Sequence, residues 1–127
     1  MVDNTECIFC NKLKNNEFVF ENDLSAALFD GFPVNKGHML IIPKRHVASY
    51  FDLTSDEIMS MNALMSQCKS FLDDKYHPDG YNIGVNVGES AGQTVFHVHM
   101  HLIPRYKGDV ENPKGGVRGV IASKQKY

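Results

Sequence analysis

Short apolar runs alternate with polar stretches along the first third of the chain, and this pattern predicts β-strands. The runs at 18–20 and 26–29 lie on either side of a short polar stretch, which is typical of a β-hairpin. A third run at 39–42 begins after Gly37 and ends at Pro43, two residue types that interrupt regular structure. We therefore expect three consecutive strands in this region.

Two further strands are predicted in the second half of the chain. Residues 81–87 alternate between apolar and polar side chains, as a strand with one buried face does. Residues 95–103 alternate in the same way and end before Pro104. A glycine-bearing loop at 88–93 joins the two segments.

One long amphipathic helix is predicted between the third and fourth strands. Residues 54–57 have the pattern of a capping box, in which Thr54 and Glu57 satisfy free N–H groups of the first turn. Behind them, apolar side chains recur at helical spacing, at Ile58, Met61, Leu64, Met65, Cys68, Phe71 and Leu72. The order of elements and their short connections predict an α+β fold, with an antiparallel sheet of about five strands and one main helix.

The composition is that of one globular domain, which we expect to span residues 1–127. Hydrophobic residues make up 43% of the chain, charged residues 22%, and the net charge of −2 predicts neither nucleic acid nor a membrane as partner. No apolar stretch approaches the roughly 20 residues that cross a bilayer, and the polar residues 1–6 do not resemble a secretory signal. Three cysteines, an odd number, disfavour a disulfide framework and point to the reducing cytoplasm.

Three of the six histidines, His97, His99 and His101, alternate with apolar residues in the last predicted strand. Alternate side chains of a strand share a face, so the three imidazoles should lie on one side and the apolar residues in the core. At about 3.3 Å per residue, the first and last are roughly 13 Å apart, too far for one metal ion to bind all three. Two neighbours could share a metal; alternatively, one imidazole acts as a nucleophile and another as a hydrogen-bond donor.

The motif at 97–103, His-Val-His-Met-His-Leu-Ile, resembles the signature of the histidine triad family, in which apolar residues separate three histidines. The preceding loop at 86–95 and the segment at 37–46 also resemble this family. The resemblance implies a nucleotide hydrolase or transferase in which His99 attacks an α-phosphate and forms a nucleotidyl-histidine intermediate. It further implies a homodimer whose sheets join across the interface, with an extended C-terminal segment, about 111–127, that crosses to the other subunit.

The resemblance also implies which groups surround the phosphate. His101, Thr94 and the backbone N–H groups of the turn at 93–95 would hold it, and Gln93 would lie near the leaving group and the attacking water. The resemblance thus assigns catalytic roles to His99, His101, Gln93 and Thr94.

The same resemblance implies how the rest of the nucleotide is bound. Asp30 would accept hydrogen bonds from the ribose hydroxyls, Asn86 would reach the phosphate or the ribose, and His38 would lie behind His99. Candidates for the apolar walls of the base pocket are Phe9, Phe29 and Leu40. The predicted nucleotide-binding set is Phe9, Phe29, Asp30, Asn86, Gly92, Gln93, Thr94, Val95, His99 and His101.

The pair Cys7-x-x-Cys10 indicates either a zinc site or redox chemistry. A thioredoxin-like motif follows a strand, whereas this pair lies at the start of the chain, which favours zinc. Zinc requires two further ligands, and two cysteines with two histidines form a common structural set. A zinc-containing branch of the histidine triad family has this arrangement, and the resemblance implies that His46 and His97 complete a structural Zn²⁺ site.

Several functions remain open at this point. The leading interpretation is an adenosine phosphoramidase-like enzyme acting on purine nucleotide conjugates. Its alternatives are a dinucleoside polyphosphate hydrolase and a zinc-stabilised nucleotide-binding protein with little turnover. A metal-dependent hydrolase that uses His97 and His99 as ligands is a further possibility.

Overall fold

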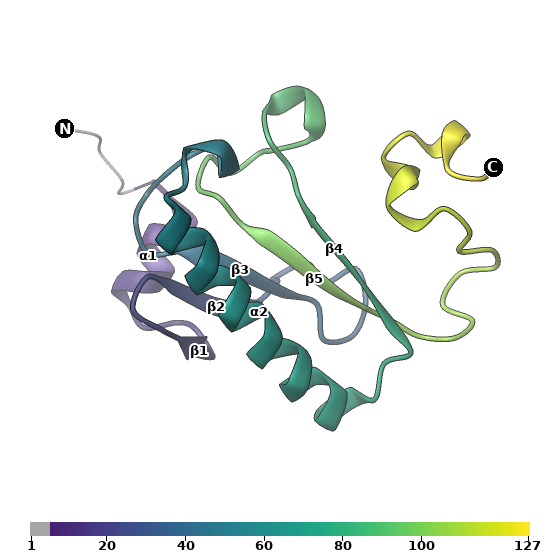
Figure 1. Cartoon of the computed structure of the whole chain (residues 1–127), viewed down its shortest axis with the longest axis horizontal. Helices are drawn as coiled ribbons and strands as arrows, with labels where there is room; N and C mark the ends of the chain where they lie inside the picture. Colours follow the sequence, from purple (N-terminus) through teal and green to yellow (C-terminus); the bar gives the residue numbers. More distant parts are fainter. Residues whose placement is uncertain (1–5) are drawn as a thin grey trace.

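A five-stranded antiparallel sheet forms the centre of the computed structural model, which describes residues 6–127 (Figure 1). Residues 1–5 lie outside the described range, and with them most of the segment that bears on a secretory signal. The strands follow the order β1-β2-β3-β5-β4, and every neighbouring pair is antiparallel. The predicted α+β class and antiparallel sheet are confirmed. The strands are β1 (Phe20–Glu21), β2 (Ser25–Phe29), β3 (Met39–Pro43), β4 (Gly80–Val85) and β5 (Met100–Arg105).

The long helix α2 (Ser55–Tyr76) covers one face of the sheet. It begins with the predicted capping box, because the Thr54 side chain accepts from the Glu57 N–H and Glu57 accepts from the Thr54 N–H. Its apolar stripe packs against inward-facing residues of the central strands. The buried side chains of this core include Ala27, Met39, Ile41, Met61, Leu64, Met65, Cys68, Leu72, Val98 and Leu102.

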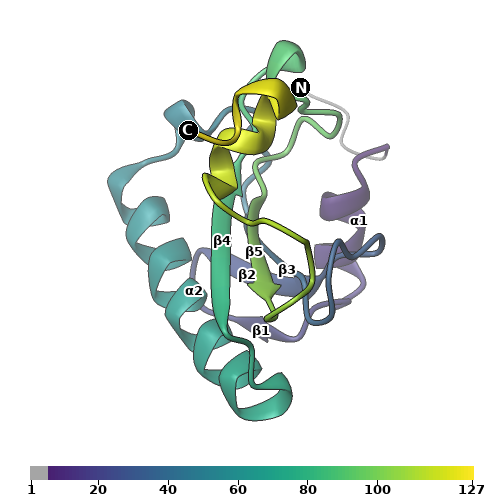
Figure 2. The same ribbon diagram turned by 90° about the vertical axis from the view of Figure 1, so that its right-hand side faces the viewer.

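A short helix, α1 (Ile8–Lys14), lies on the opposite face of the sheet, as Figure 2 shows. The sequence pattern did not predict it, because seven residues are too few to establish a helical period. The Cys7 side chain accepts a hydrogen bond from the Cys10 N–H at the start of this helix. Phe9 packs into a second core with Leu28 and Leu40, so α1 is attached to the face on which His101 lies beside Leu40.

The predicted strand at 95–103 was wrong in its first half, because β5 begins only at Met100. Residues 95–99 leave the sheet and approach the segment after β3, where the Val98 N–H donates to the Val47 carbonyl at 2.8 Å. His97 and Val98 are both buried, which a strand with one buried face does not allow. Pro104 lies inside β5 rather than after it. Since β3 pairs only with residues 100–102, the missing proline N–H costs no pairing on that side.

The C-terminal segment folds into two 3-10 helices, η3 (Gly116–Val120) and η4 (Ala122–Lys124), where the sequence led us to expect extended chain. The Arg118 guanidinium donates to the carbonyls of Lys124 and Gln125, which turns the segment back on itself. η3 lies beside β4 at the edge of the sheet (Figure 2). Two further 3-10 turns, η1 (Tyr50–Asp52) and η2 (Glu89–Ala91), lie in loops. No helix within residues 6–127 combines the length and apolar character needed to cross a membrane.

Candidate active site and metal centre

The orientation of the His99 ring is set by its own backbone neighbourhood. Its Nδ1 lies 2.9 Å from the His97 carbonyl oxygen, and a carbonyl can only accept a hydrogen bond. Nδ1 therefore carries the proton and donates, which leaves a lone pair on Nε2. The Phe9 ring packs against the imidazole, with ring centroids 5.0 Å apart. In the neutral form of the predicted nucleophile the lone pair is thus on Nε2, in a ring held by Phe9 and the His97 carbonyl.

A second hydrogen-bond chain fixes the proton of His101. The Val34 N–H donates to His38 Nδ1 at 3.0 Å, so the proton of His38 lies on Nε2. That N–H points to His101 Nδ1 at 2.9 Å and to an Asp30 carboxylate oxygen at 3.4 Å. His101 must then carry its own proton on Nε2, as a donor. The structure places His38 behind His101, not behind His99 as expected.

Burial keeps this histidine chain neutral. It lowers the pKa of His101 to about 4, and nearby His99 and His38 contribute to the lowering. Burial also lowers the pKa of His38, although the Asp30 carboxylate opposes that shift. Both imidazoles are therefore uncharged at neutral pH, as the tautomer assignment requires.

The His99 and His101 rings face a pocket of about 450 Å³ between α1, the ends of β2 and β3, and the loop after β4. Asp30, Asn86 and Thr94 line it together with His99 and His101. The pocket combines an apolar wall with convergent polar groups, which is the usual character of a small-molecule site. The predicted residues Phe9, Phe29, Gly92, Val95 and Leu40 also line it.

The loop before the triad presents backbone donors to this pocket. Gly88 and Gly92 have φ angles of +90° and +93°, which allow the chain to turn tightly around η2. The Gln93 N–H donates to the Gly88 carbonyl, whereas within residues 6–127 the N–H groups of Thr94 and Val95 have no acceptor. These two N–H groups can bind a phosphate oxygen.

The Gln93 side chain points away from the pocket and holds the loop together. It is buried, its Oε1 accepts from the Gly88 N–H at 2.9 Å, and its Nε2 donates to the carbonyls of Ala48 at 2.7 Å and Val95 at 3.2 Å. These bonds use both N–H donors of the carboxamide and one lone pair of its oxygen. In this arrangement Gln93 holds the loop in position, and its place near the leaving group stays a prediction.

The Phe29 ring belongs mainly to the opposite face of the sheet. It packs against Phe71 of α2, with centroids 6.3 Å apart, and the Lys75 ammonium lies over it. Leu28, which sequence reasoning did not single out, lines the pocket beside Leu40. A strand alternates its side chains, so the choice between positions 28 and 29 required the register of β2.

The four predicted metal ligands come together behind the nucleophile. The Sγ atoms of Cys7 and Cys10 and the Nδ1 atoms of His46 and His97 all lie within 4.8 Å of one another. Adjacent pairs are separated by 3.2 to 3.5 Å. Bonds of about 2.0–2.3 Å to a tetrahedral zinc ion require ligand separations of roughly 3.3–3.8 Å. This donor set therefore fits Zn²⁺, which would tie α1 to the segment after β3.

The hydrogen bonds of His97 direct its ring toward the cysteine–histidine cluster and away from His99. Its Nε2–H donates to the Pro43 carbonyl at 2.8 Å, so its Nδ1 lone pair faces the cysteines. Burial lowers the pKa of His97, which keeps a lone pair available, while burial and Cys7 raise the pKa of Cys10 to about 11. With both nitrogens of His97 engaged in this way, the geometry disfavours a catalytic metal shared with His99.

Asp30, His38 and His101 are also close enough to one another to suggest a metal site. The tautomers oppose it, because the Val34 N–H occupies Nδ1 of His38 and leaves a proton, not a lone pair, on Nε2. This cluster is better described as a hydrogen-bond relay.

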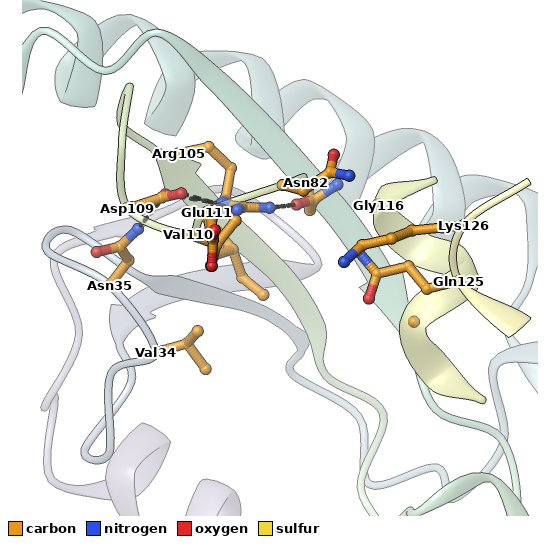
Figure 3. Close-up of a pocket in the computed structure, with 13 residues that line it drawn as sticks. Val34, Asn35, Asn82, Arg105, Asp109, Val110, Glu111, Gly116, Gln125 and Lys126 are labelled. Atoms are coloured by element: carbon orange, nitrogen blue, oxygen red, sulfur yellow. Dashed lines mark hydrogen bonds and ion pairs between the residues drawn. The ribbon is translucent and has the colours of Figure 1, made fainter. Parts of the chain in front are cut away.

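A second cavity, of about 570 Å³, lies between β4, β5 and the C-terminal segment (Figure 3). Arg105 donates to both carboxylate oxygens of Asp109, at 2.8 and 2.9 Å, and to Asn82 Oδ1 at 2.6 Å. Asp109 also accepts from Asn35 at 2.8 Å, and Arg105 lowers the pKa of its carboxyl group. These groups satisfy one another, and no triad histidine lines the cavity. The network anchors the β2–β3 loop, which carries Asp30 and leads to His38.

Comparison with known proteins agrees with this geometry. The model of the HIT domain matches residues 11–108. An uncharacterized HIT-like protein of Methanocaldococcus jannaschii is 42% identical over 87% of each chain. A bis(5'-adenosyl)-triphosphatase of Dictyostelium discoideum is 39% identical over 79% of this chain and 67% of its own. The crystal structure of a Zn-bound histidine triad family protein from Mycobacterium smegmatis has a TM-score of 0.77 at 32% identity, and covers 84% of this chain and 80% of its own. The chain belongs to the HIT domain family.

Proposed function

We propose that this protein hydrolyses dinucleoside polyphosphates at an α-phosphate through a nucleotidyl-histidine intermediate on His99. One observation carries the proposal: His99 donates from Nδ1 to the His97 carbonyl, which leaves the Nε2 lone pair free beside the pocket. A neutral imidazole held in this way is a competent nucleophile near pH 7. The named activity of the Dictyostelium relative supports this substrate class.

In the first step the Nε2 lone pair attacks the α-phosphorus and a P–N bond forms. The bridging P–O bond breaks, and its electron pair leaves with the departing nucleotide. His101 donates from Nε2 to a phosphate oxygen, and the free N–H groups of Thr94 and Val95 stabilise the developing charge. In the second step water attacks phosphorus, loses its proton and releases a nucleoside monophosphate, and the electron pair of the P–N bond returns to His99.

The remaining residues bind and orient the substrate. Asp30 lies beside the relay histidines at the pocket and accepts hydrogen bonds from the ribose hydroxyls. Asn86 lines the same pocket, and no described residue bonds to its side chain, so it is free to bind ribose or phosphate. Cys7, Cys10, His46 and His97 would hold a Zn²⁺ ion, which would support α1 and its Phe9 structurally.

The second candidate is a nucleoside phosphoramidase, in which the same attack expels an amine. The pocket supports it as much as the first, because both reactions use the same groups around the nucleotidyl part of the substrate. The two activities share the intermediate and differ only in the group that departs.

The test compares turnover of diadenosine triphosphate, an adenosine phosphoramidate and ADP by the wild type, His99→Ala and the control His77→Asn. His77 is exposed at the end of α2, in the left-handed conformation that asparagine tolerates. We expect His99→Ala to lose more than about 10³-fold in kcat and the control to be unchanged. Acid-labile, base-stable labelling of the wild type by substrate should identify the intermediate. Undiminished turnover by His99→Ala would refute the proposal, and loss of activity on adding a chelator at unchanged fold would favour a metal-dependent hydrolase.

We also propose that the protein is a homodimer whose sheets join at β4. Among residues 6–127, β4 pairs with a strand only on its β5 side and Ile83 on it is half exposed; η3, which lies beside the outer edge of β4, would move aside on pairing. Light scattering should give twice the chain mass, and an Ile83→Lys variant should shift it to that of the monomer. A wild type that is monomeric at micromolar concentration would refute this proposal.

A further inference from the structure

Lys12 places a positive charge at the otherwise apolar end of the nucleotide pocket. It lies on α1 one turn after Ile8 and Phe9, and all three line the pocket. The opposing wall at this end consists of Leu28 and Leu40, which belong to the buried core under Phe9. Lys12 itself is half-buried. A cation among aliphatic and aromatic side chains at a pocket wall suggests that a ligand supplies its partner.

The ammonium of Lys12 is free to act. Within residues 6–127 no carboxylate forms an ion pair with it and no acceptor is bound by its Nζ, whereas Lys44 pairs with Glu21 and Lys69 with Asp73. The nearby Lys14, on the same helix, is exposed and does not line the pocket. Lys12 is therefore the lysine of α1 that can meet a ligand.

The order of groups along the pocket indicates which part of the ligand lies there. His99 and Thr94 mark the phosphate and Asp30 marks the ribose. The base requires apolar walls, and α1 with Leu28 and Leu40 provides them. The edge of the base then lies within reach of a lysine side chain on α1.

On this basis, and resting on the proposed function, we propose that Lys12 selects 6-oxopurine nucleotides over 6-aminopurine nucleotides. Guanine and hypoxanthine present two acceptors, O6 and N7, on one edge, and a lysine ammonium can donate to both. Adenine presents N7 together with the N6 amino group, which is itself a donor and opposes the ammonium. A charge-assisted hydrogen bond present with one base and absent with the other corresponds to about a tenfold preference at a half-exposed site.

The experiment measures kcat/KM for matched guanosine, inosine and adenosine substrates, and by calorimetry the Kd of GMP, IMP and AMP. The variants are Lys12→Met, which keeps the length of the side chain without its charge, Lys12→Arg, which keeps the charge, and Lys14→Met as control. Zinc content is measured for each variant, because Cys10 is nearby in the sequence.

For the wild type, Lys12→Arg and Lys14→Met, we expect kcat/KM for the guanosine and inosine substrates to exceed that for the adenosine substrate by about tenfold. For Lys12→Met, we expect the three values to agree within about threefold. Inosine distinguishes recognition of O6 from recognition of the 2-amino group, which it lacks. Equal use of the three bases by the wild type, a preference that survives in Lys12→Met, or inosine behaving like adenosine would each overturn the inference.

The binding arm separates this inference from the proposed function. If GMP and IMP bind more tightly than AMP through Lys12 while no substrate is turned over, the selectivity holds and the hydrolase proposal fails. If all substrates are hydrolysed without a base preference, the hydrolase proposal holds and the role of Lys12 is refuted.

Discussion

The buried carboxamide of Gln93 offers the sharpest test of how the loop before the triad, residues 88–95, is held in place. Gln93→Leu keeps the approximate volume and removes three hydrogen bonds, to Gly88, Ala48 and Val95. At about 1 kcal/mol net for each bond, the free energy of unfolding should fall by about 3 kcal/mol. For a domain of this size that corresponds to a decrease in Tm of about 10 °C. Ser90→Ala, an exposed substitution in the same loop, should leave Tm unchanged.

The kinetic readout distinguishes a positioning role from direct catalysis. A loosened loop should raise KM and lower kcat together, because the N–H groups of Thr94 and Val95 lose their fixed places. Urea denaturation and steady-state kinetics on the same samples measure both effects. A Gln93→Leu protein with wild-type stability, unchanged KM and a kcat lowered by about 10² would refute this reasoning and restore direct catalysis.

A second substitution at this position adds a pH signature. In Gln93→Glu, a carboxylate would face the carbonyl oxygens of Ala48 and Val95, whereas a protonated carboxyl group can donate to one of them. The pKa of the introduced group should therefore be raised in the folded state, and the variant should lose stability as pH rises through it. Stability of Gln93→Glu that increases between pH 5 and 8 would contradict the observed bonding.

Three further predictions concern the surroundings of the site. The hydrogen bonds from Arg45 lower the pKa of Glu57 from 4.5 to about 2, so Glu57 contributes stability above pH 4.5 that is lost as pH falls toward 2. The shift in pKa corresponds to at most about 3 kcal/mol of folding free energy. Because Arg45 is half exposed, we expect Glu57→Gln to lose about 2 kcal/mol of stability at pH 7 and less than half of that at pH 3. Urea denaturation at the two pH values measures both losses. Cys7→Ser/Cys10→Ser should reduce zinc from about one ion per chain to nearly none by elemental analysis, whereas Cys68→Ala should retain it; equal zinc in both would exclude the cluster as the site. His38→Phe should lower kcat by about 10² with a smaller change in nucleotide Kd, since the proton on the neighbouring triad histidine is no longer fixed; unchanged kcat would remove the relay from the mechanism.

Periodic patterns identified the elements that are long or regular enough to show a period. The capping box located the start of α2 and the apolar stripe its body as far as Leu72, while the apolar runs located β2 and β3. α1 is too short for such a signal. Residues 95–99 alternate like a strand, but they lie outside the sheet, where His97 contacts both cysteines and Val98 bonds to Val47; a sequence pattern does not contain these long-range contacts.

The residues of the candidate site were likewise predictable in part. The triad motif and the cysteine pair located the pocket and the metal cluster, because the side chains themselves are distinctive. The sequence did not predict the side-chain orientations: the Gln93 side chain points into the interior and the Phe29 ring points toward α2. His38 bonds to His101, a contact that depends on the β3–β5 register. Lys12 had no motif to mark it.

The metal cluster also has a consequence for how the protein is made. Cys7 and His97 are 90 residues apart in the chain, and closing a loop of that length costs about 4 kcal/mol of entropy before any contact rewards it. The candidate nucleotide pocket has one wall on α1, and His99, its proposed nucleophile, follows His97 by two residues. During synthesis, the pocket therefore cannot form until residues 97–101 have left the ribosome, and the proposed zinc ligands would meet only at the same point. Binding of the proposed zinc ion and completion of the pocket would then be one late event in folding.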